Sequence, residues 1–275
     1  PEEIGRRALA VNASDCAAMG AAPRFALLSL LVPPTLAVAV LDGIYAGLRA
    51  EAARYGIAIV GGNVARDPEH LILDITLLGL GSRDHLLRRD GARPGDALLV
   101  TGTLGAAAAG LRLLDDPALA ARLAPEVCAP LLAAQRTPVA RVAAGQWLAR
   151  HGATAALDIS DGLAADLAHL CAASGVGAMI EVAAFPILPA TRVLATASDS
   201  AASDLALFGG EDYELLFTAP ADQAAAITVA LPAATGTPAT VIGTITAEPA
   251  IMRVDDGRGT ALVARGWDHL HTADR

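Results

Sequence analysis

Cysteine and aromatic residues are scarce in this chain of 275 residues, and long apolar runs are absent. Cys16, Cys128 and Cys171 show no CxxC spacing, which argues against a disulfide framework or a zinc site and favours a reducing cytoplasm. Aromatics are only 3% of the residues, and much of the 54% hydrophobic content is alanine, which disfavours an all-β protein. Glycine, threonine or proline interrupts every apolar segment before it could span a bilayer, so we expect no membrane partner.

Basic residues are also in deficit. Lys and Arg total 20 against 29 Asp and Glu, for a net charge of −9. Phosphate backbones are bound by clustered basic side chains, so a nucleic-acid partner is not expected. Small anionic substrates remain compatible with this charge, because bound metal ions can reverse the local field.

Strand and helix patterns alternate along the chain and predict an α+β fold in which helices cover sheets. Residues 81–96 concentrate arginine and turn signals and form a candidate linker. The predicted helices are 1–19, 36–55, 105–114, 138–151, 161–173 and 222–230. The predicted strands are 24–32, 57–60, 71–80, 97–101, 154–157, 177–182, 213–218, 239–245 and 250–254. Within 71–80, Leu71, Leu73, Ile75 and Leu77 form a wholly apolar face, which we expect to face the core.

Two carboxylates close together, Asp158 and Asp161, flank Ser160 where an apolar run ends and a helix is predicted to begin. Helix capping is the ordinary explanation for Asp and Ser at such a position, but one residue is enough for a cap. The repulsion between two acids is relieved if a cation such as Mg²⁺ binds there, because hard cations prefer carboxylate oxygens and link them to phosphates. We interpret this segment as a metal or phosphate site. Asp15, beside Ser14 within the first helix, is a candidate third carboxylate, although a surface-facing acid is the alternative.

Glycine-rich segments supply further candidates. Consecutive glycines in Gly61-Gly62-Asn63 let the backbone approach a ligand closely, although a simple turn explains them equally well. Residues 101–105 open a helix after a strand and could suit an anion or form only a tight turn. They lack the lysine of a P-loop. Residues 209–214, with three acids after two glycines, could shape a ligand site or form a solvated turn.

Taken together, these segments resemble the thiamine-monophosphate kinases, within the wider superfamily named for aminoimidazole ribonucleotide synthetase. The resemblance is carried by NASD at 12–15, GGNVARDP at 61–68, RRDGARPGDALLVTGTLG at 88–105, LDISDGLAADL at 157–167 and FGGEDYELLFT at 208–218. It implies an architecture of two domains, 1–92 and 93–275. The first would bind ATP and magnesium and form a homodimer; the second would be an α/β domain.

The resemblance also implies roles for individual residues. Magnesium would be bound by Asp15, Asp158, Asp161 and Asn63. ATP would be contacted by Gly62, Arg89 and Ser160, and thiamine monophosphate by Glu211 and Trp267. The family usually carries aspartate at the position of Asn63, which keeps a carbonyl oxygen but lacks the charge. The family also has an upstream GDDA segment, so we expect that a piece preceding Pro1 is missing.

The implied reaction converts ATP and thiamine monophosphate into ADP and thiamine diphosphate. The attacking phosphate oxygen is already anionic at neutral pH, so no catalytic general base is expected. Two alternatives remain open: another ATP-dependent synthetase of the same superfamily, and a non-catalytic nucleotide-binding homologue.

Overall fold

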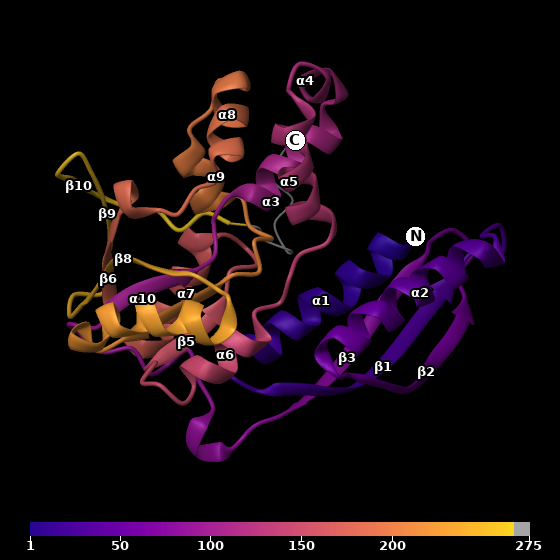
Figure 1. Cartoon of the computed structure of the whole chain (residues 1–275), viewed down its shortest axis with the longest axis horizontal. Coiled ribbons are helices and arrows are strands. Elements are labelled where there is room, and N and C mark those ends of the chain that lie inside the picture. Colours follow the sequence, from indigo (N-terminus) through magenta and orange to yellow (C-terminus); the bar gives the residue numbers. More distant parts are fainter. Residues whose placement is uncertain (267–275) are drawn as a thin grey trace.

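The computed structural model describes residues 1–266, which form two β-sheets with helices packed against them (Figure 1). The first sheet has three strands in the order β2-β1-β3, and β1 is parallel to β2 and antiparallel to β3. Its strands are β1 (Ala22–Val32), β2 (Ala58–Arg66) and β3 (Ile72–Leu80). Two helices, α1 (Glu2–Ala18) and α2 (Val38–Tyr55), pack together on this sheet.

The helices of the first sheet form where the sequence patterns predict them. Glu2 and Glu3 occupy the first turn of α1, where the helix dipole favours negative charge. Gly56 ends α2 with a φ of +68°, a left-handed conformation that glycine adopts without strain. Leu9 of α1, Ile44 and Leu48 of α2 and Leu28 and Leu30 of β1 are buried between helices and sheet.

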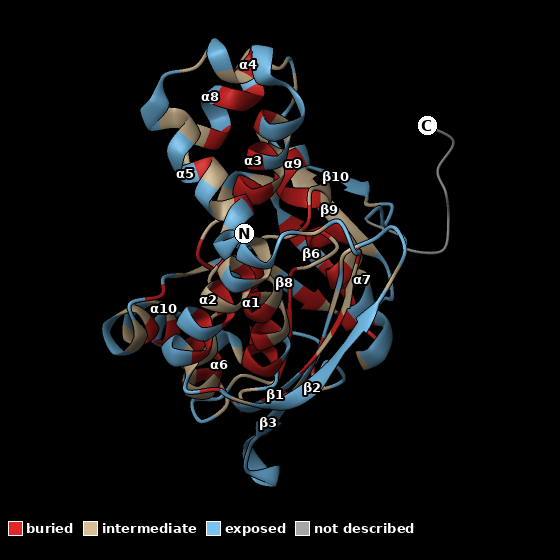
Figure 2. Cartoon of the chain, turned by 90° about the vertical axis from the view of Figure 1, so that its right-hand side faces the viewer, coloured by how far each residue is buried: buried red, intermediate tan, exposed pale blue. Residues whose placement is uncertain are grey.

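The apolar face predicted for residues 71–80 does point into this core. Ile75 is buried, and Leu71, Leu73 and Leu77 pack against the same cluster. The opposite face of the sheet is open in the single chain (Figure 2). We define the outer face as the exposed apolar side chains that β1 and β3 place there: Phe25, Leu27, Ile72, Leu78 and Leu80.

The second sheet has seven strands in the order β10-β9-β6-β8-β4-β7-β5. Only β6 and β9 pair in parallel, and the other neighbours are antiparallel. The strands are β4 (Ala97–Thr101), β5 (Ala155–Asp158), β6 (Gly177–Glu181), β7 (Leu215–Ala219), β8 (Ala239–Thr246), β9 (Ile251–Asp255) and β10 (Arg258–Ala261).

Helices cover both faces of the second sheet. Helices α6 (Val142–Leu148) and α10 (Ala221–Thr235) share a core with Leu99 and Phe217. On the other face, α7 (Leu163–Ser174) shares a core with Leu98 and Val100. Beside this sheet, a helical lobe buries its own apolar cluster (Figure 1). Its members are α3 (Ala106–Asp115), α4 (Pro117–Ala121), α5 (Pro125–Arg136), α8 (Pro189–Ala197) and α9 (Ala202–Phe208).

Several elements differ from the sequence prediction. Strand β2 continues through Gly61-Gly62-Asn63 to Arg66 and does not end at residue 60. Helix α6 is shorter than the predicted 138–151. Helices α4, α5, α8 and α9 and strand β10 were not predicted. Short 3-10 turns at Arg83–His85 and Val182–Ala184 complete the described elements.

Helix α1 belongs to both cores. Its first half packs on the first sheet, whereas Ala17 and Ala18 belong to the core that the second sheet shares with α6 and α10. The close approach of α1 and α6 depends on Gly145, where a Cβ would lie 1.9 Å from the carbonyl oxygen of Ala17. The C-terminal end of α1 is therefore held against the second sheet.

No helix within residues 1–266 is both long enough and apolar enough to cross a membrane.

The crossing of α1 and α2 generates a stability prediction. A Cβ at Gly47 would lie 2.0 Å from the carbonyl oxygen of Glu2, so Gly47→Ala must push the helices apart. We expect a loss of roughly 1–3 kcal/mol in the free energy of unfolding, measured by urea denaturation. Ala50→Ser adds one atom at an exposed position of the same helix and should be nearly neutral. Equal stability of the two variants would contradict this account of the crossing.

Candidate active site

Asp158 is the last residue of β5 and is only 8% exposed. Because the C-terminal half of α1 packs against β5, Asp15 lies close enough for its charge to act on Asp158. Asp161 follows three residues later and adds a third interacting carboxylate. Packing between two elements that are distant in sequence therefore brings together Asp15, Asp158 and Asp161, which we call the acid group.

The acid group is electrostatically unfavourable in the ligand-free chain. Burial raises the pKa of Asp158 to about 6 from 3.8, and the charges of Asp15 and Asp161 act in the same direction. The side chain of Ser14 moderates that rise, yet its buried Oγ makes no hydrogen bond of normal geometry. Burial also raises the pKa of Asp15, and Arg89 opposes the rise. Repelling carboxylates beside an unpaired hydroxyl suit a positively charged ligand.

A cavity of about 710 Å³ opens beside the acid group. Asp15, Asp158 and Arg89 line it together with apolar residues such as Met19 and Leu157. The neighbouring Arg88 is already bound to Asp90 through two hydrogen bonds of 2.9 and 2.7 Å. Within residues 1–266 no ion pair engages Arg89, so its guanidinium is available to an anion in this cavity.

A second cavity, of about 570 Å³, lies on the other side of Asp161. Ser160, Asp161, Glu211, Tyr213 and Phe208 all line it. The acid group thus stands between two cavities, one with a free guanidinium and one with a carboxylate and aromatic rings. This arrangement suits two ligands whose charged ends meet at the acids.

The backbone that carries Glu211 is strained. Glu211 and Tyr213 have φ values of +59° and +50°, which non-glycine residues rarely adopt. Arg7 of α1 forms an ion pair with the Glu211 carboxylate, and Gln135 of α5 donates to it at 2.8 Å. Arg7 also donates to the backbone carbonyl of Gln135 and lies over the Tyr213 ring, 5.9 Å from its centroid. Two separate helices, α1 and α5, thereby hold Glu211 at the wall of the second cavity.

The loop at residues 101–105 is not an anion site for a ligand, although the sequence allowed that reading. The carboxylate of Asp212 already accepts hydrogen bonds from the backbone N–H groups of Gly105, at 2.8 Å, and Ala107, at 3.4 Å. Burial raises the pKa of Asp212 to about 7, and the backbone N–H groups at the start of α3 oppose the rise. The N-terminus of α3 therefore binds an acid of the chain itself.

Two predicted ligand-binding residues do not reach the acid group in this chain. Gly62 and Asn63 lie in β2, at the outer edge of the first sheet, paired with Leu28 and Ser29 of β1 (Figure 1). Gly62 has its own structural reason, because a Cβ there would lie 1.8 Å from the carbonyl oxygen of Leu28. The metal role that the resemblance implies for Asn63 stays a prediction. Trp267 lies outside the described residues.

The donor chemistry of the acid group fits a divalent cation, but its geometry does not form a complete metal cage. No group of three or more His, Cys, Asp or Glu side chains within residues 1–266 converges on one metal position. Magnesium commonly takes one or two protein carboxylates and completes its shell with water and substrate phosphates. The residues present fit that mode of binding.

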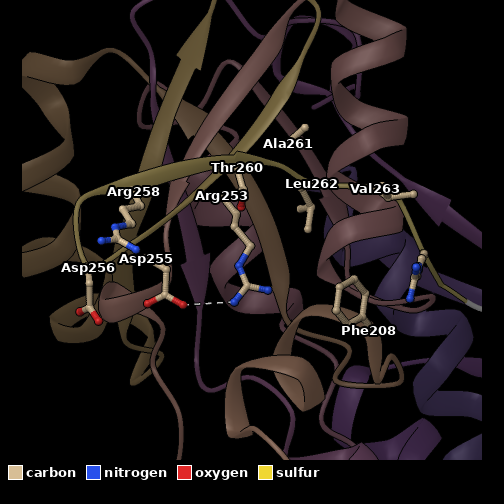
Figure 3. A pocket seen from close by; sticks show the side chains of 10 residues that line it. Phe208, Arg253, Asp255, Asp256, Arg258, Thr260, Ala261, Leu262 and Val263 are labelled. Carbon is tan, nitrogen blue, oxygen red and sulfur yellow. Dashed lines mark hydrogen bonds and ion pairs between the residues drawn. The ribbon is translucent and has the colours of Figure 1, made fainter.

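A third cavity, of about 730 Å³, lies beneath the β9–β10 hairpin (Figure 3). Three arginines, Arg253, Arg258 and Arg265, line it with two acids, Asp255 and Asp256. Arg253 is already paired with Asp255 at 3.2 Å and with Asp204 at 3.9 Å. No aspartate of the acid group lines this cavity, so it is a weaker candidate for a substrate that meets a cation than the two cavities that adjoin the acid group.

Sequence reasoning missed Arg7, Ser14 and Gln135. Arg7 and Ser14 are seven residues apart, so they lie on one face of α1, and this polar stripe within an alanine-rich helix was a usable signal. Gln135 had no local signal, because the Glu211 that it contacts is 76 residues away.

Two family models together match most of this chain. Residues 1–81 match the family model for the N-terminal domain of AIR synthase related proteins, and residues 93–255 match the corresponding C-terminal domain. The thiamine-monophosphate kinase of Salmonella typhimurium is 38% identical, over 99% of this chain and 81% of that protein.

Solved structures of similar fold lead to the same family. The thiamine-monophosphate kinase of Stenotrophomonas maltophilia superposes with a TM-score of 0.85 at 40% identity, covering 94% of this chain and 80% of that one. A structure of AaThiL complexed with AMPPCP and TMP superposes with a TM-score of 0.86 at 33% identity, covering 98% and 81%.

The raised pKa of Asp158 generates a prediction about stability. Between about pH 4 and 6 the folded protein retains a proton that the unfolded chain has released, so stability falls as the pH rises through this window. At pH 7 the buried charge therefore opposes folding. Asp158→Asn removes it and should raise the free energy of unfolding of the ligand-free protein by about 2 kcal/mol.

Chemical denaturation at pH 7 and at pH 4.5 measures this effect. The gain should shrink at the lower pH, where the wild-type acid is mostly protonated when folded. Asp222→Asn, at an exposed acid of α10, should show no gain at either pH. A gain for Asp158→Asn that does not depend on pH would contradict the electrostatic explanation.

Proposed function

The chain belongs to the thiamine-monophosphate kinase family, and on that premise we propose that it transfers the terminal phosphoryl group of ATP to thiamine monophosphate, with Mg²⁺ as the metal. The products are ADP and thiamine diphosphate. The observation that carries this function is the acid group standing between two cavities, with Arg89 in one and Glu211 in the other.

The reaction needs alignment and charge neutralisation more than proton transfer. The nucleophile is a phosphate oxygen of thiamine monophosphate that is ionised at neutral pH, so no side chain has to remove a proton from it. Bound divalent cations neutralise the charge that accumulates on the phosphate oxygens. Asp15, Asp158 and Asp161 would hold these cations, each by one or two carboxylate oxygens.

Other side chains would orient the two substrates. Arg89 offers a planar guanidinium that matches phosphate oxygens, and Ser160 offers a hydroxyl to ATP at the edge of the second cavity. Glu211 would contact the positively charged thiamine moiety, and Arg7 and Gln135 would keep its carboxylate in place. The role of Trp267 as a further thiamine contact rests on the resemblance alone.

Asn63 and Gly62 keep their family roles only as proposals. Asn63 offers one neutral carbonyl oxygen where the family usually has a carboxylate, so any cation that it helps to bind would be held less tightly. Its exposure on β2 leaves it accessible to a ligand that is not bound by the acid group.

We also propose that residues 1–92 form the dimerisation and ATP/Mg-binding domain and residues 93–275 the second domain. Two separate sheets, one within 22–80 and one within 97–261, support this division. The outer face of the first sheet supports a homodimer, because monomers rarely expose contiguous apolar surface of this kind. A cytoplasmic location is supported by three cysteines that form no disulfide bond.

An enzyme assay tests the activity directly. Purified protein with ATP, Mg²⁺ and thiamine monophosphate should produce thiamine diphosphate, detected by chromatography. Asp158→Asn and Asp161→Asn should each lower kcat by roughly 100-fold or more while the protein stays folded, because each removes a charge that neutralises the cations. The control Asp222→Asn should match the wild type.

Three outcomes would contradict this proposal. Binding of an ATP analogue without product would favour the non-catalytic homologue. Turnover of aminoimidazole precursors instead of thiamine monophosphate would favour another synthetase of the superfamily. Normal rates for both aspartate variants at saturating magnesium would show that Asp158 and Asp161 do not bind the magnesium ions.

The dimer is tested by solution mass. Sedimentation equilibrium should give twice the 27.8 kDa of one chain. Leu78→Glu places a charge within the outer face and should shift the protein to monomer. Val229→Glu makes the same change at an exposed position of α10 and should leave the mass unchanged. A wild-type protein that sediments as a monomer would refute the dimer.

A further inference from the structure

Three backbone N–H groups converge on a single carboxylate oxygen beside the acid group. Oδ2 of Asp166 accepts hydrogen bonds from the backbone N–H groups of Ser160 at 3.0 Å, Asp161 at 3.0 Å and Gly162 at 3.1 Å. Asp166 is only 4% exposed and lies in the first turn of α7. It lines neither of the two cavities that adjoin the acid group.

This arrangement reverses an ordinary helix cap. Gly162, the residue before α7, has no side chain that could accept a hydrogen bond from the first turn. Asp166 instead reaches back from within the helix, as the acid of a capping box does, but it satisfies three amides of the preceding loop where a capping box satisfies one. These three hydrogen bonds restrain three successive residues, so the loop conformation depends strongly on this carboxylate.

The direction of these amides decides what the loop can offer to a ligand. Successive backbone N–H groups before a helix often form a concave binding site for phosphate. Here all three amides point inward to Asp166, so they are not available to a nucleotide. Ser160 and Asp161 line the second cavity, which Asp166 does not.

The carbonyl groups of the same loop are also engaged. The N–H of Glu211 donates to the carbonyl oxygen of Ser160 at 2.8 Å, and the N–H of Tyr213 donates to that of Ile159 at 2.9 Å. The strained loop that carries Glu211 therefore rests on the loop that Asp166 holds. One buried carboxylate supports both walls of the second cavity.

We propose that Asp166 is a positioning residue for phosphoryl transfer: it holds the backbone of residues 160–162 so that Ser160 and Asp161 face the substrates, and it touches neither substrate nor metal. This inference rests on the proposed function for its catalytic part. Its structural part, the restraint of the loop, can be measured without any substrate.

The first measurement is amide hydrogen exchange of the ligand-free protein, resolved by residue with NMR. In Asp166→Asn the exchange rates of the amides of residues 160–162 should rise at least about tenfold, because the uncharged side chain holds them less tightly. Protection in the middle of α7 should persist. Asp222→Asn, the same substitution in the first turn of α10, should change neither region.

The second measurement is steady-state kinetics with ATP and thiamine monophosphate. A displaced loop should lower kcat and raise the KM for ATP, each by roughly 10–100-fold, the range typical of residues that orient metal ligands. A variant that is merely less stable would contain fewer active molecules, so its apparent kcat would fall while its KM stayed constant. Asp166→Glu, which keeps the charge, should recover part of the loss.

The outcomes separate this inference from the proposed function. A folded Asp166→Asn protein with unchanged loop exchange, or with unchanged KM and kcat, would overturn the role of Asp166. A wild-type protein that makes no thiamine diphosphate would overturn the proposed function. In that case the exchange comparison would still show whether Asp166 restrains the loop.

Discussion

Repulsion between carboxylates that the fold itself brings together is the constraint on which this site depends. Asp158 is buried at the end of β5, an edge strand of the second sheet, and α1 places Asp15 beside it. Hydrophobic packing of α1 against both cores supplies the free energy that keeps these like charges close. The ligand-free chain is thereby prepared for cations and phosphates before either is present, as expected for a site that works by electrostatic preorganisation.

Hydrogen bonds within the chain already engage several polar groups near the acid group. The amides before α7 go to Asp166, those at the start of α3 go to Asp212, and Glu211 is held by Arg7 and Gln135. Arg89, in contrast, lines the first cavity and forms no ion pair within residues 1–266. Its guanidinium is therefore left for a ligand, whereas the amides before α7 and α3 serve to build the site.

Sequence reasoning could find the parts of the site that are close together in the chain. Asp158, Ser160 and Asp161 were visible because three polar residues interrupt an apolar pattern. The role of Asp212 was not visible, because its hydrogen-bond partners are 105 and 107 residues away. Gly62 alone cannot identify a ligand site, because close approach of two strands demands glycine as strongly as a ligand does. The helical lobe was missed although Pro117, Pro125 and Pro189 mark three helix starts.

The contact between Gly145 and Ala17 has a mechanical consequence. Both ends of α1 are held, one by the first sheet and the other by α6. Asp15 belongs to α1 and Asp158 to the second sheet, so the spacing between these two like charges is set by how closely the helix packs there. A side chain larger than hydrogen at position 145 would therefore alter the acid group without touching either carboxylate.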